Sequence, residues 1–379
     1  MAGTVVDLFS GCGGFGLSAH QAGFDVVAAV DVDVDLTWSH TRNFPNTRML
    51  VGDLATPDIR TILGDLMVER IDGVIGGPPC QGFSVIGRGR SGDLRNDLVG
   101  AFFRHVETIR PRFFVMENVA GLLAPGNRGL LDHQIDMISR HYHVGPPLRL
   151  NAKDFGAPTD RRRVVVVGIR RGEAGAFDPS LLTPETQPTR VRDAIWDLTD
   201  VSPSTDVEGD LDWWDVSASG SSAFATSLRA DPIPNLGWEP AVTRMRQRRI
   251  SGMRRTIHAP YVIERFANLE PGKRDPVGRH QRLKWDGISP TLRAGTGREF
   301  GSYQSVRPIH PSEPRVITTR EAARLQGFPD WFVFHPTIWH SFRMIGNSVS
   351  PFMGTAVLRA VRQTFEARSG NPRVASVAD

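Results

Sequence analysis

The sequence predicts an α/β protein with a mostly parallel sheet and a second, smaller domain. Within the first 170 residues, short apolar runs alternate with segments of helical spacing. This order is typical of a parallel sheet covered by helices on both faces. The 379 residues are 40% hydrophobic, enough to bury a sizeable core, and the length fits two domains better than one. The 38 glycines and 27 prolines favour a loop-rich α/β protein over a helical bundle.

The apolar runs of the first domain are predicted to be buried strands, with helices between them. The strands are expected at Val5–Phe9, Val26–Val30, Gly73–Ile75, Phe113–Met116 and Val164–Ile169. The helices are expected at 15–22, 33–43, 95–110 and 129–142, and a final amphipathic helix at Met353–Glu366.

After Arg171 the alternation stops and the distribution of charge changes. Residues 200–239 contain eight acidic residues and one basic residue, whereas residues 244–298 contain fourteen basic and four acidic residues. So sharp a change predicts a second domain. We expect one domain at 1–170 plus 345–379 and a smaller one at 171–344.

Composition excludes several classes of protein. Two cysteines, Cys12 and Cys80, cannot form a disulfide framework and lack metal-ligand spacing, so we expect no metal site. The N-terminus has no signal-peptide pattern, and no apolar run approaches 18 residues, which predicts a soluble, cytoplasmic protein without a membrane segment. The formal net charge is +4 and 42 of the 45 basic residues are arginines, which suit phosphate and base-edge recognition.

A glycine-rich turn follows the first strand. Gly11, Gly13 and Gly16 fit the pattern G-x-G-x-x-G, and Asp31 lies 20 residues beyond Gly11, at the end of the second strand. This spacing fits NAD, FAD or S-adenosylmethionine, with the carboxylate on ribose hydroxyls. The alternative is a turn that serves packing alone. Asp53, after a short third strand, can accept a hydrogen bond from an adenine amino group, or it can simply cap a helix.

Three further sites lie at strand ends, where open α/β sheets bind ligands. The loop Gly76–Ser84 places Cys80 behind two prolines that fix its direction, which favours a nucleophile over an inert buried thiol. Cys12, among glycines, is interpreted as a buried apolar residue. Glu117 ends the fifth strand, where it can contact a ring nitrogen or merely cap the next segment. Strand alternation puts Arg161 and Arg163 on one face, as a pair for one ligand or as part of a solvated face.

Taken in order, these segments resemble the DNA cytosine-5 methyltransferase family, of the bacterial restriction-modification type. The resemblance rests on Phe9–Gly14, Pro78–Gln81, Glu117–Val119, Arg161 with Arg163, Thr319–Pro329 and Gly346–Val349. It covers roughly residues 4–170 and 285–365. It implies a Rossmann-like methyltransferase domain with a mixed, mostly parallel sheet, and a smaller target-recognition domain whose sequence resembles nothing identifiable.

The resemblance also implies a set of site residues, an S-adenosylmethionine cofactor and double-stranded DNA as the substrate of a monomer. The cofactor is expected at Phe9, Ser10, Gly11, Gly13, Gly14, Asp31, Val32, Asp53, Leu54, Pro78, Asn347 and Ser348. The catalytic residues are expected to be Cys80, Glu117, Arg161 and Arg163. DNA contacts are expected from Gln81, Ser84, Arg248 and Arg249.

The implied mechanism starts with addition of the Cys80 thiolate to C6 of cytosine, because C5 alone is a poor nucleophile. Glu117 protonates or hydrogen-bonds N3, C5 then attacks the sulfonium methyl, and loss of the C5 proton expels Cys80. The base must first flip out of the duplex. The arginine pair would steady the flipped nucleotide and Glu117. One departure from the family is Thr159, where the family often has Gln, so a contact made by that Gln is not assumed.

Three alternatives remain. A dinucleotide-dependent oxidoreductase fits the glycine turn and Asp31 but gives Cys80, Glu117 and the basic stretch no role. A tRNA cytosine-5 methyltransferase is expected to lack a large insert, whereas roughly 110 residues separate Arg171 from Arg282. A non-catalytic DNA-binding relative would not need the chemical groups that are present. The sequence leaves open the target site, and whether a restriction endonuclease or phage-defence system accompanies the protein.

Overall fold

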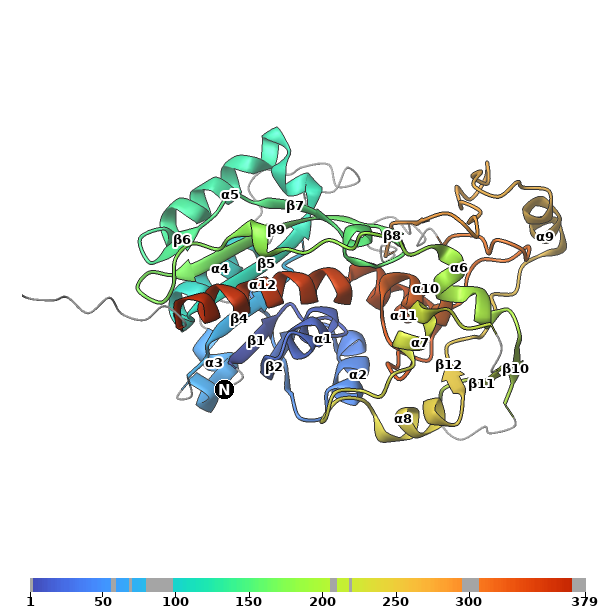
Figure 1. Cartoon of the computed structure of the whole chain (residues 1–379), viewed down its shortest axis with the longest axis horizontal. Coiled ribbons are helices and arrows are strands. Elements are labelled where there is room, and N and C mark those ends of the chain that lie inside the picture. Colours follow the sequence, from blue (N-terminus) through green and yellow to red (C-terminus); the bar gives the residue numbers. More distant parts are fainter. Residues whose placement is uncertain are drawn as a thin grey trace, which may run out of the picture.

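The fold is built on a twisted central sheet. The computed structural model describes residues 3–55, 59–67, 70–79, 98–204, 210–217, 220–294 and 307–369. The strand order is β3-β2-β1-β4-β5-β9-β6, and β7 also pairs with β9 (Figure 1). The strands are β1 Thr4–Leu8, β2 Asp25–Asp31, β3 Arg48–Val51, β4 Gly73–Gly76, β5 Phe113–Val119, β6 Tyr142–Val144, β7 Leu148–Asn151 and β9 Arg162–Arg170. The five neighbouring strands β3, β2, β1, β4 and β5 are parallel to one another, which confirms the predicted mixed, mostly parallel sheet.

Strand β9 runs antiparallel to its neighbours. It pairs antiparallel with β5 on one side and with β6 and β7 on the other. The segment from β5 through α5 (Pro125–Ile138) to β6 is a crossover, which brings β6 back parallel to β5 and leaves a gap of one strand. Strand β9 fills that gap from the opposite direction.

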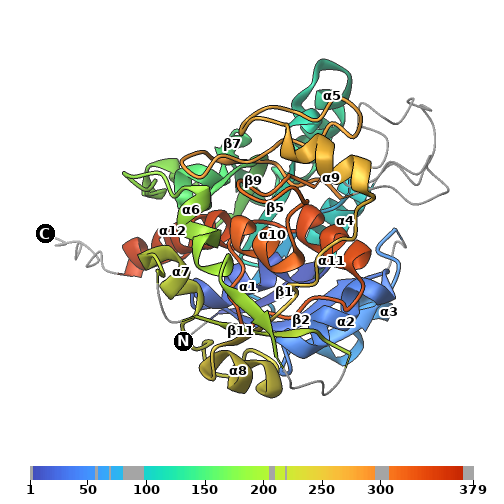
Figure 2. The same cartoon turned by 90° about the vertical axis from the view of Figure 1, so that its right-hand side faces the viewer.

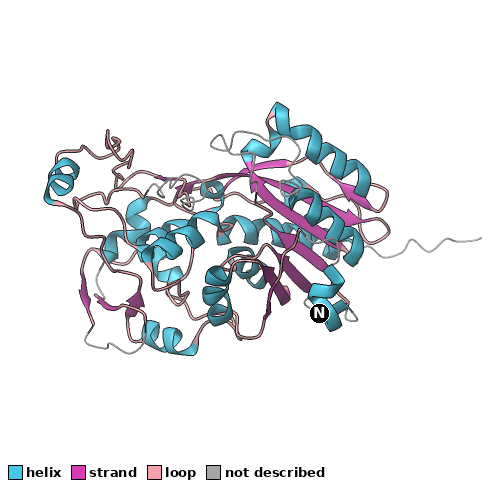
Figure 3. Cartoon of the chain, turned by 180° about the vertical axis from the view of Figure 1, so that it is seen from behind, coloured by secondary structure: helices cyan, strands magenta, loops and turns pink. Residues whose placement is uncertain are grey.

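Helices cover both faces of the sheet because successive strand residues point to opposite sides. On one face, residues such as Val5 and Val115 pack against α1 (Gly14–Gln21) and α12 (Pro351–Ser369). On the other face, residues such as Val6 pack against α3 (Ile59–Leu63), α4 (Leu98–Ile109) and α5. Figure 3 shows the sheet from behind with helices to either side. Helix α2 (Val34–Asn43) connects β2 to β3.

One predicted helix ends earlier than expected. The helix predicted at 129–142 is α5, which begins at Pro125 and stops at Ile138, and β6 begins at Tyr142. The Tyr142 side chain is fully buried, and its hydroxyl donates to the Pro111 carbonyl at 2.8 Å. Burying this large ring in the sheet layer outweighs continuing the helical pattern.

Residues 171–344 form a smaller region around a three-stranded antiparallel sheet, β10-β11-β12. Its elements are α6 Val191–Ile195, β10 Val201–Pro203, β11 Trp213–Val216, α7 Ala223–Leu228, α8 Glu239–Arg246, β12 Arg249–Ser251, α9 Pro260–Ala267 and α10 Thr319–Gln326, and α11 Ile338–Asn347 extends across its end. A short parallel pair joins β8 (Thr159–Asp160) to β13 (Ser289–Pro290). The 3₁₀ turns are Gly64–Met67, Ala120–Leu123, Ala152–Phe155, Pro179–Leu181 and Trp196–Leu198.

The smaller region packs tightly on the larger one. Residues of α6, α8, α10 and α11 share one hydrophobic core with Leu17, Leu36 and Phe44. Figure 2 looks onto α10, α11 and β11, with the central sheet behind them. After α11 the chain returns to the first layer, where the Ser18 hydroxyl of α1 donates to the Pro351 carbonyl at 3.2 Å. The domain boundaries near 170 and 345 stay a prediction.

A buried arginine fixes the orientation of α10. Arg324 is fully buried, 2.7 Å from Asp197 and 2.6 Å from Asp330. Burial alone would raise the pKa of Asp330, but the guanidinium groups of Arg324, Arg320 and Arg229 together outweigh that effect and lower it. Within the described ranges, no helix is long and apolar enough to cross a bilayer, and no three metal-ligating side chains gather at one point.

Candidate active site

The strand register brings the predicted site residues to one edge of the sheet. Leu8 of β1 lies opposite Val30 of β2 and Gly76 of β4, and Gly76 lies opposite Met116 of β5. The residues that directly follow these four therefore lie side by side near the carboxyl ends of the parallel strands, although β5 itself continues to Val119 and Glu117 is still paired with Val165 of β9. They are Phe9, Asp31, Gly77 and Glu117.

The glycine turn and Asp31 form one unit. Phe9, Gly11 and Gly13 have φ values of 58°, 55° and 94°, so the chain turns sharply through the left-handed region. The Asp31 carboxylate accepts hydrogen bonds from the Gly11 amide at 2.8 Å and from the Asp33 amide at 2.9 Å. Burial nevertheless raises the pKa of Asp31. Because a carboxylate has about four acceptor positions, Asp31 retains capacity for a ligand hydroxyl.

The segment Gly346–Val349, which contains the predicted cofactor residues Asn347 and Ser348, lies against this turn. A Cβ atom on Gly14 would lie 2.6 Å from the Val349 carbonyl and 3.0 Å from Ser348 Cβ, so only glycine fits there. The side chain of Asn347 is exposed and that of Ser348 is half-buried. Two segments more than 300 residues apart in sequence therefore meet at one place.

The remaining predicted cofactor residues differ in their environments. Val32 is 63% exposed at the end of β2, whereas the Leu54 side chain is buried. Asp53 accepts a hydrogen bond from the Ala55 amide at 2.9 Å, which closes a local turn and is not a helix cap, because α3 begins only at Ile59. The Ser10 hydroxyl is buried and has no hydrogen-bond partner within the part of the chain that the structure describes.

Glu117 and the two arginines form a buried charged cluster. Glu117 Oε1 lies 2.8 Å from Arg163 Nε, and both side chains are about one-tenth exposed. Burial raises the pKa of Glu117 despite the opposing effect of Arg163 and Arg161. Arg161 is fully buried, Arg163 is largely buried and Arg162 is exposed, as strand alternation predicts.

Arg161 also joins the cluster to the C-terminal segment. Its guanidinium donates to the carbonyls of Gly346 at 3.0 Å, Ser348 at 2.6 Å and Leu292 at 3.4 Å. These contacts link Arg161 to the segment Gly346–Val349, which lies against the glycine turn. The two arginines thus have different partners, although their charges lie close enough to influence the same carboxyl group.

The loop that carries Cys80 starts beside Glu117. The Asn118 side-chain amide donates to the Pro78 carbonyl at 3.0 Å, and a Cβ on Gly77 would lie 3.5 Å from Glu117 Oε2. Cys80, Gln81 and Ser84 lie outside the described residues. Sequence reasoning assigned no role to Asn118, although its position next to Glu117 was the available signal.

Two other sequence interpretations concern residues near the site. Cys12 is 2% exposed and burial raises the pKa of its thiol to about 12, so it is protonated at neutral pH, in line with its interpretation as an apolar core residue. Thr159, which replaces the family's usual Gln, is fully buried, and its hydroxyl lies 3.5 Å from the Pro290 carbonyl. At this position the side chain supports the pairing of β8 with β13.

The basic stretch is partly neutralised within the protein. Arg249 pairs with Asp215 at 3.0 Å, and Arg246 pairs with Asp231 at 2.9 Å, so two of its arginines contact the acidic stretch. Arg248 is exposed, at a φ of 61°, and makes no ion pair within the described ranges. The predicted DNA contacts Arg248 and Arg249 are therefore in different electrostatic settings.

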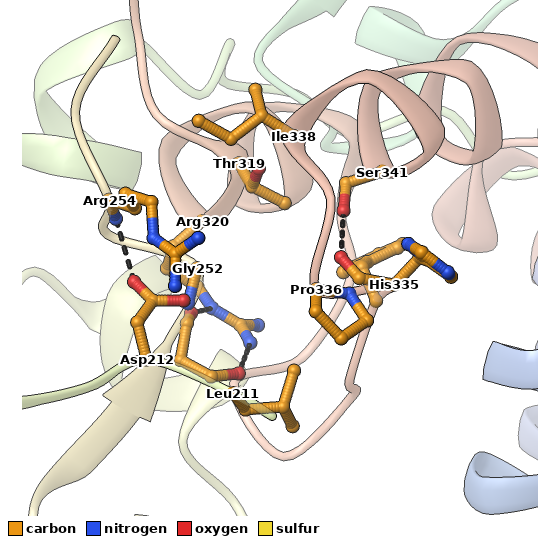
Figure 4. A pocket seen from close by; sticks show the side chains of 12 residues that line it. Leu211, Asp212, Gly252, Arg254, Thr319, Arg320, His335, Pro336, Ile338 and Ser341 are labelled. Atoms are coloured by element: carbon orange, nitrogen blue, oxygen red, sulfur yellow. Dashed lines mark hydrogen bonds between the residues drawn. The ribbon is translucent and has the colours of Figure 1, made fainter. Parts of the chain in front are cut away.

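A small pocket lies between the β11–β12 pair and helices α10 and α11. Asp212 stands at its rim and accepts hydrogen bonds from the amides of Gly252 at 3.1 Å and Arg254 at 2.7 Å (Figure 4). Among the predicted site residues that the structure describes, none lines this pocket. The two hydrogen bonds to Asp212 instead fix the backbone at Gly252 and Arg254, directly after β12.

Comparison with solved structures defines the class of the protein. The chain matches an E. coli prophage-encoded protein assigned as a DNA modification methyltransferase, with a TM-score of 0.85 and 37% identity over 96% of this chain and 100% of that one. It matches the Schizosaccharomyces pombe Dnmt2 methyltransferase with a TM-score of 0.60 and 16% identity over 96% and 99% of the two chains, a likeness of fold. The fold is therefore that of S-adenosylmethionine-dependent methyltransferases of nucleic acids.

The chain belongs to the C-5 cytosine-specific DNA methylase family, whose model matches residues 3–363. It is 41% identical to the type II methyltransferase M.XorII of Xanthomonas oryzae pv. oryzae, over 95% of this chain and 86% of that protein. It is 29% identical to the type II methyltransferase M.NgoPII of Neisseria gonorrhoeae, over 96% of each. The protein is a DNA cytosine-5 methyltransferase, which confirms the class that the ordered motifs predicted.

Proposed function

We propose that this enzyme methylates C5 of cytosine within a specific double-stranded DNA sequence, through covalent addition of Cys80 to C6 of a flipped base. The observation that carries the proposal is the buried Glu117–Arg163 pair, which lies beside the start of the Cys80 loop. The pair lies at the same level of the sheet as the Asp31–Gly11 unit. Nucleophile, acid and cofactor site would then converge on one base.

Glu117 is suited to act as the acid. Nucleophilic addition to C6 places negative charge on the ring, and a proton or a strong hydrogen bond at N3 removes it. Burial raises the pKa of Glu117 and so favours the protonated form that can donate. Arg163 holds the carboxyl group in one orientation, and Arg161 fixes the adjoining backbone at Ser348.

The residues around the glycine turn fit S-adenosylmethionine, which supplies an electrophilic methyl group when bound. Asp31 has acceptor positions for ribose hydroxyls, and the buried Ser10 hydroxyl lacks a partner within the described ranges. A Cβ on Gly11 would meet no atom of the described residues within 4 Å, so the described part of the chain leaves space beside the turn. Val32, 63% exposed at the same edge, offers an apolar surface for a purine ring.

We further propose that residues 171–344 recognise the target sequence, with residues 1–170 and 345–379 as the catalytic domain. The basic stretch and the exposed Arg248 support this division. The type II names of the relatives support a restriction-modification setting with a cognate endonuclease. The tRNA alternative is less favoured, because the region between Arg171 and Arg282 folds into strands and helices of its own.

The test combines substrate choice with mapping of the product. Purified enzyme would be incubated with labelled S-adenosylmethionine and either duplex DNA or a tRNA pool, and methylated cytosines in the DNA would be located by sequencing. We expect 5-methylcytosine at one short DNA sequence and no label in tRNA. Label in tRNA alone would overturn the proposed DNA substrate. A melting temperature raised by NAD and not by S-adenosylmethionine would contradict the proposed cofactor.

A further inference from the structure

A short segment of the smaller region, residues 289–293, runs directly past the arginine cluster. Its first residues form β13, which pairs with β8 just before Arg161. The Ser289 amide donates to the Pro158 carbonyl at 2.9 Å, and the Thr291 hydroxyl donates to the Asp160 carbonyl at 2.5 Å. The segment is thereby attached to the chain that leads into the active site.

Two further contacts fix the end of the segment. The Leu292 side chain is 2% exposed in the shared core, and its carbonyl accepts a hydrogen bond from Arg161 at 3.4 Å. A Cβ on Gly346 would lie 2.9 Å from the carbonyl carbon of Arg293, so the two backbones are in close contact. Gly346 is also the residue whose carbonyl Arg161 binds at 3.0 Å. The backbone of Arg293 is therefore held at the edge of the catalytic cluster.

The Arg293 side chain, in contrast, is exposed and makes no ion pair or hydrogen bond within the described ranges. Its neighbours in the cluster are engaged: Arg163 with a carboxylate and Arg161 with three carbonyls. The planar fork of a guanidinium matches the oxygens of a phosphate, and because the fork is pre-organised less freedom is lost per hydrogen bond formed.

We propose that Arg293 binds the backbone phosphate next to the target cytidine and holds the nucleotide in its flipped position. The proposal rests on the proposed function, because it requires a DNA substrate. Flipping rotates a nucleotide about its own backbone, so a fixed cation at the adjacent phosphate favours the extruded state. Phosphate contacts position a nucleic acid without reading its sequence. Arg293 is therefore a positioning residue that acts on every cognate site alike.

The experiment compares Arg293→Ala and Arg293→Lys with Arg254→Ala. Arg254 is an exposed arginine of the same basic stretch whose backbone is held by Asp212. The readouts are DNA affinity against salt, fluorescence of 2-aminopurine at the target position in the saturated complex, and calorimetric affinity for S-adenosylmethionine. For Arg293→Ala we expect affinity for DNA to fall about 10- to 100-fold. The salt slope should fall by about 0.9, with a reduced flipping signal.

The controls separate this role from a structural one. Arg293→Lys should recover the salt slope but only part of the flipping signal, because lysine lacks the planar fork. Arg254→Ala should leave the flipping signal of the saturated complex unchanged, and all three variants should bind the cofactor normally. The proposal is overturned if Arg293→Ala flips the base as the wild type does, or if Arg254→Ala loses the signal equally. If wild-type enzyme fails to methylate DNA, the proposed function itself is wrong.

Discussion

The carboxyl edge of the central sheet and the basic stretch of the smaller region differ in how their polar side chains are held. At the sheet edge, functional groups are buried and bound by partners distant in sequence, as in the Glu117–Arg163 and Gly11–Asp31 contacts. In the basic stretch, Arg248 is exposed while the adjacent Arg249 pairs with a carboxylate. Burial thus determines what each group can do at the edge, whereas charge alone does not show which arginines are available for DNA.

This difference has an energetic consequence. Removing one partner of a buried ion pair leaves an unpaired charge and costs about 3–5 kcal/mol. Removing one partner of an exposed pair costs about 0–1 kcal/mol. Substitutions at the sheet edge should therefore cause large losses in chemistry or cofactor binding. Substitutions in the basic stretch should cause small changes that become visible mainly through their dependence on salt.

The largest expected effect is that of Cys80→Ala. Without the thiolate, C5 of cytosine is not activated, so methyl transfer should be abolished. Binding of S-adenosylmethionine should persist, because the glycine turn and Asp31 are untouched. The measurement is methyl transfer under single-turnover conditions, alongside calorimetric cofactor binding. Retention of methylation at a near wild-type rate would show that Cys80 is not the nucleophile.

Glu117→Gln should slow the chemical step by about 10²–10⁴-fold, the usual contribution of a general acid. The amide keeps the shape of the side chain but cannot transfer a proton to N3. DNA affinity should change much less, since Glu117 is buried. Single-turnover rates and DNA titrations distinguish these effects. If the single-turnover rate barely changes, Glu117 is a structural cap.

The pH dependence gives a second test of Glu117. Burial raises the pKa of Glu117, and Arg163 and Arg161 together lower it by less. As pH rises through that pKa, the protonated acid is lost, so the rate should fall. In Arg163→Ala the pKa of Glu117 should rise further, and the fall in rate should begin at higher pH. A profile displaced toward lower pH would contradict the assigned electrostatics.

Much of the sheet edge could be predicted from the sequence because motifs and strand ends occur in a fixed order. The positions of Gly14 and Ser348 are an example, since both belong to recognisable motifs, and they prove to be in contact. The contact between Asn118 and the Pro78 carbonyl was not predictable, because no short-range pattern specifies a backbone acceptor 40 residues away. The Arg249–Asp215 pair was missed for the same reason. Counting charges does not identify tertiary partners.

Asp31→Ala should have an intermediate effect. It removes the acceptor proposed to hold the ribose hydroxyls and weakens the support of the Gly11 amide. We expect S-adenosylmethionine affinity to fall by about 1–3 kcal/mol, the scale of hydrogen bonds to a charged group. Asp35→Ala, an exposed carboxylate of the neighbouring helix, is the matched control and should bind normally. Equal calorimetric affinities for wild type and Asp31→Ala would place the ribose contact elsewhere.

The smallest effects are expected from substitutions of the adjacent residues Arg248 and Arg249. These two arginines compare an exposed charge with one that is held by a carboxylate. Sequence reasoning expected both to contact DNA, with internal charge balance as the alternative. Arg248 is exposed, so Arg248→Ala should weaken binding to all DNA alike and reduce the log–log salt slope by about 0.9. Its melting temperature should match wild type, because alanine at the same positive φ adds little new strain.

Arg249→Ala should show the opposite behaviour. It breaks the pair with Asp215, which joins β12 to β11, so its melting temperature should fall slightly while its salt slope stays near the wild-type value. Asp215→Ala is the control, because it breaks the same pair from the acidic side and should lower the melting temperature similarly. If Arg249→Ala lowers the salt slope as much as Arg248→Ala does, the pair must open when DNA binds. Arg249 would then pair with Asp215 in the free protein and with a phosphate in the complex. An ion pair seen in the free protein would in that case not show that an arginine has no contact with DNA.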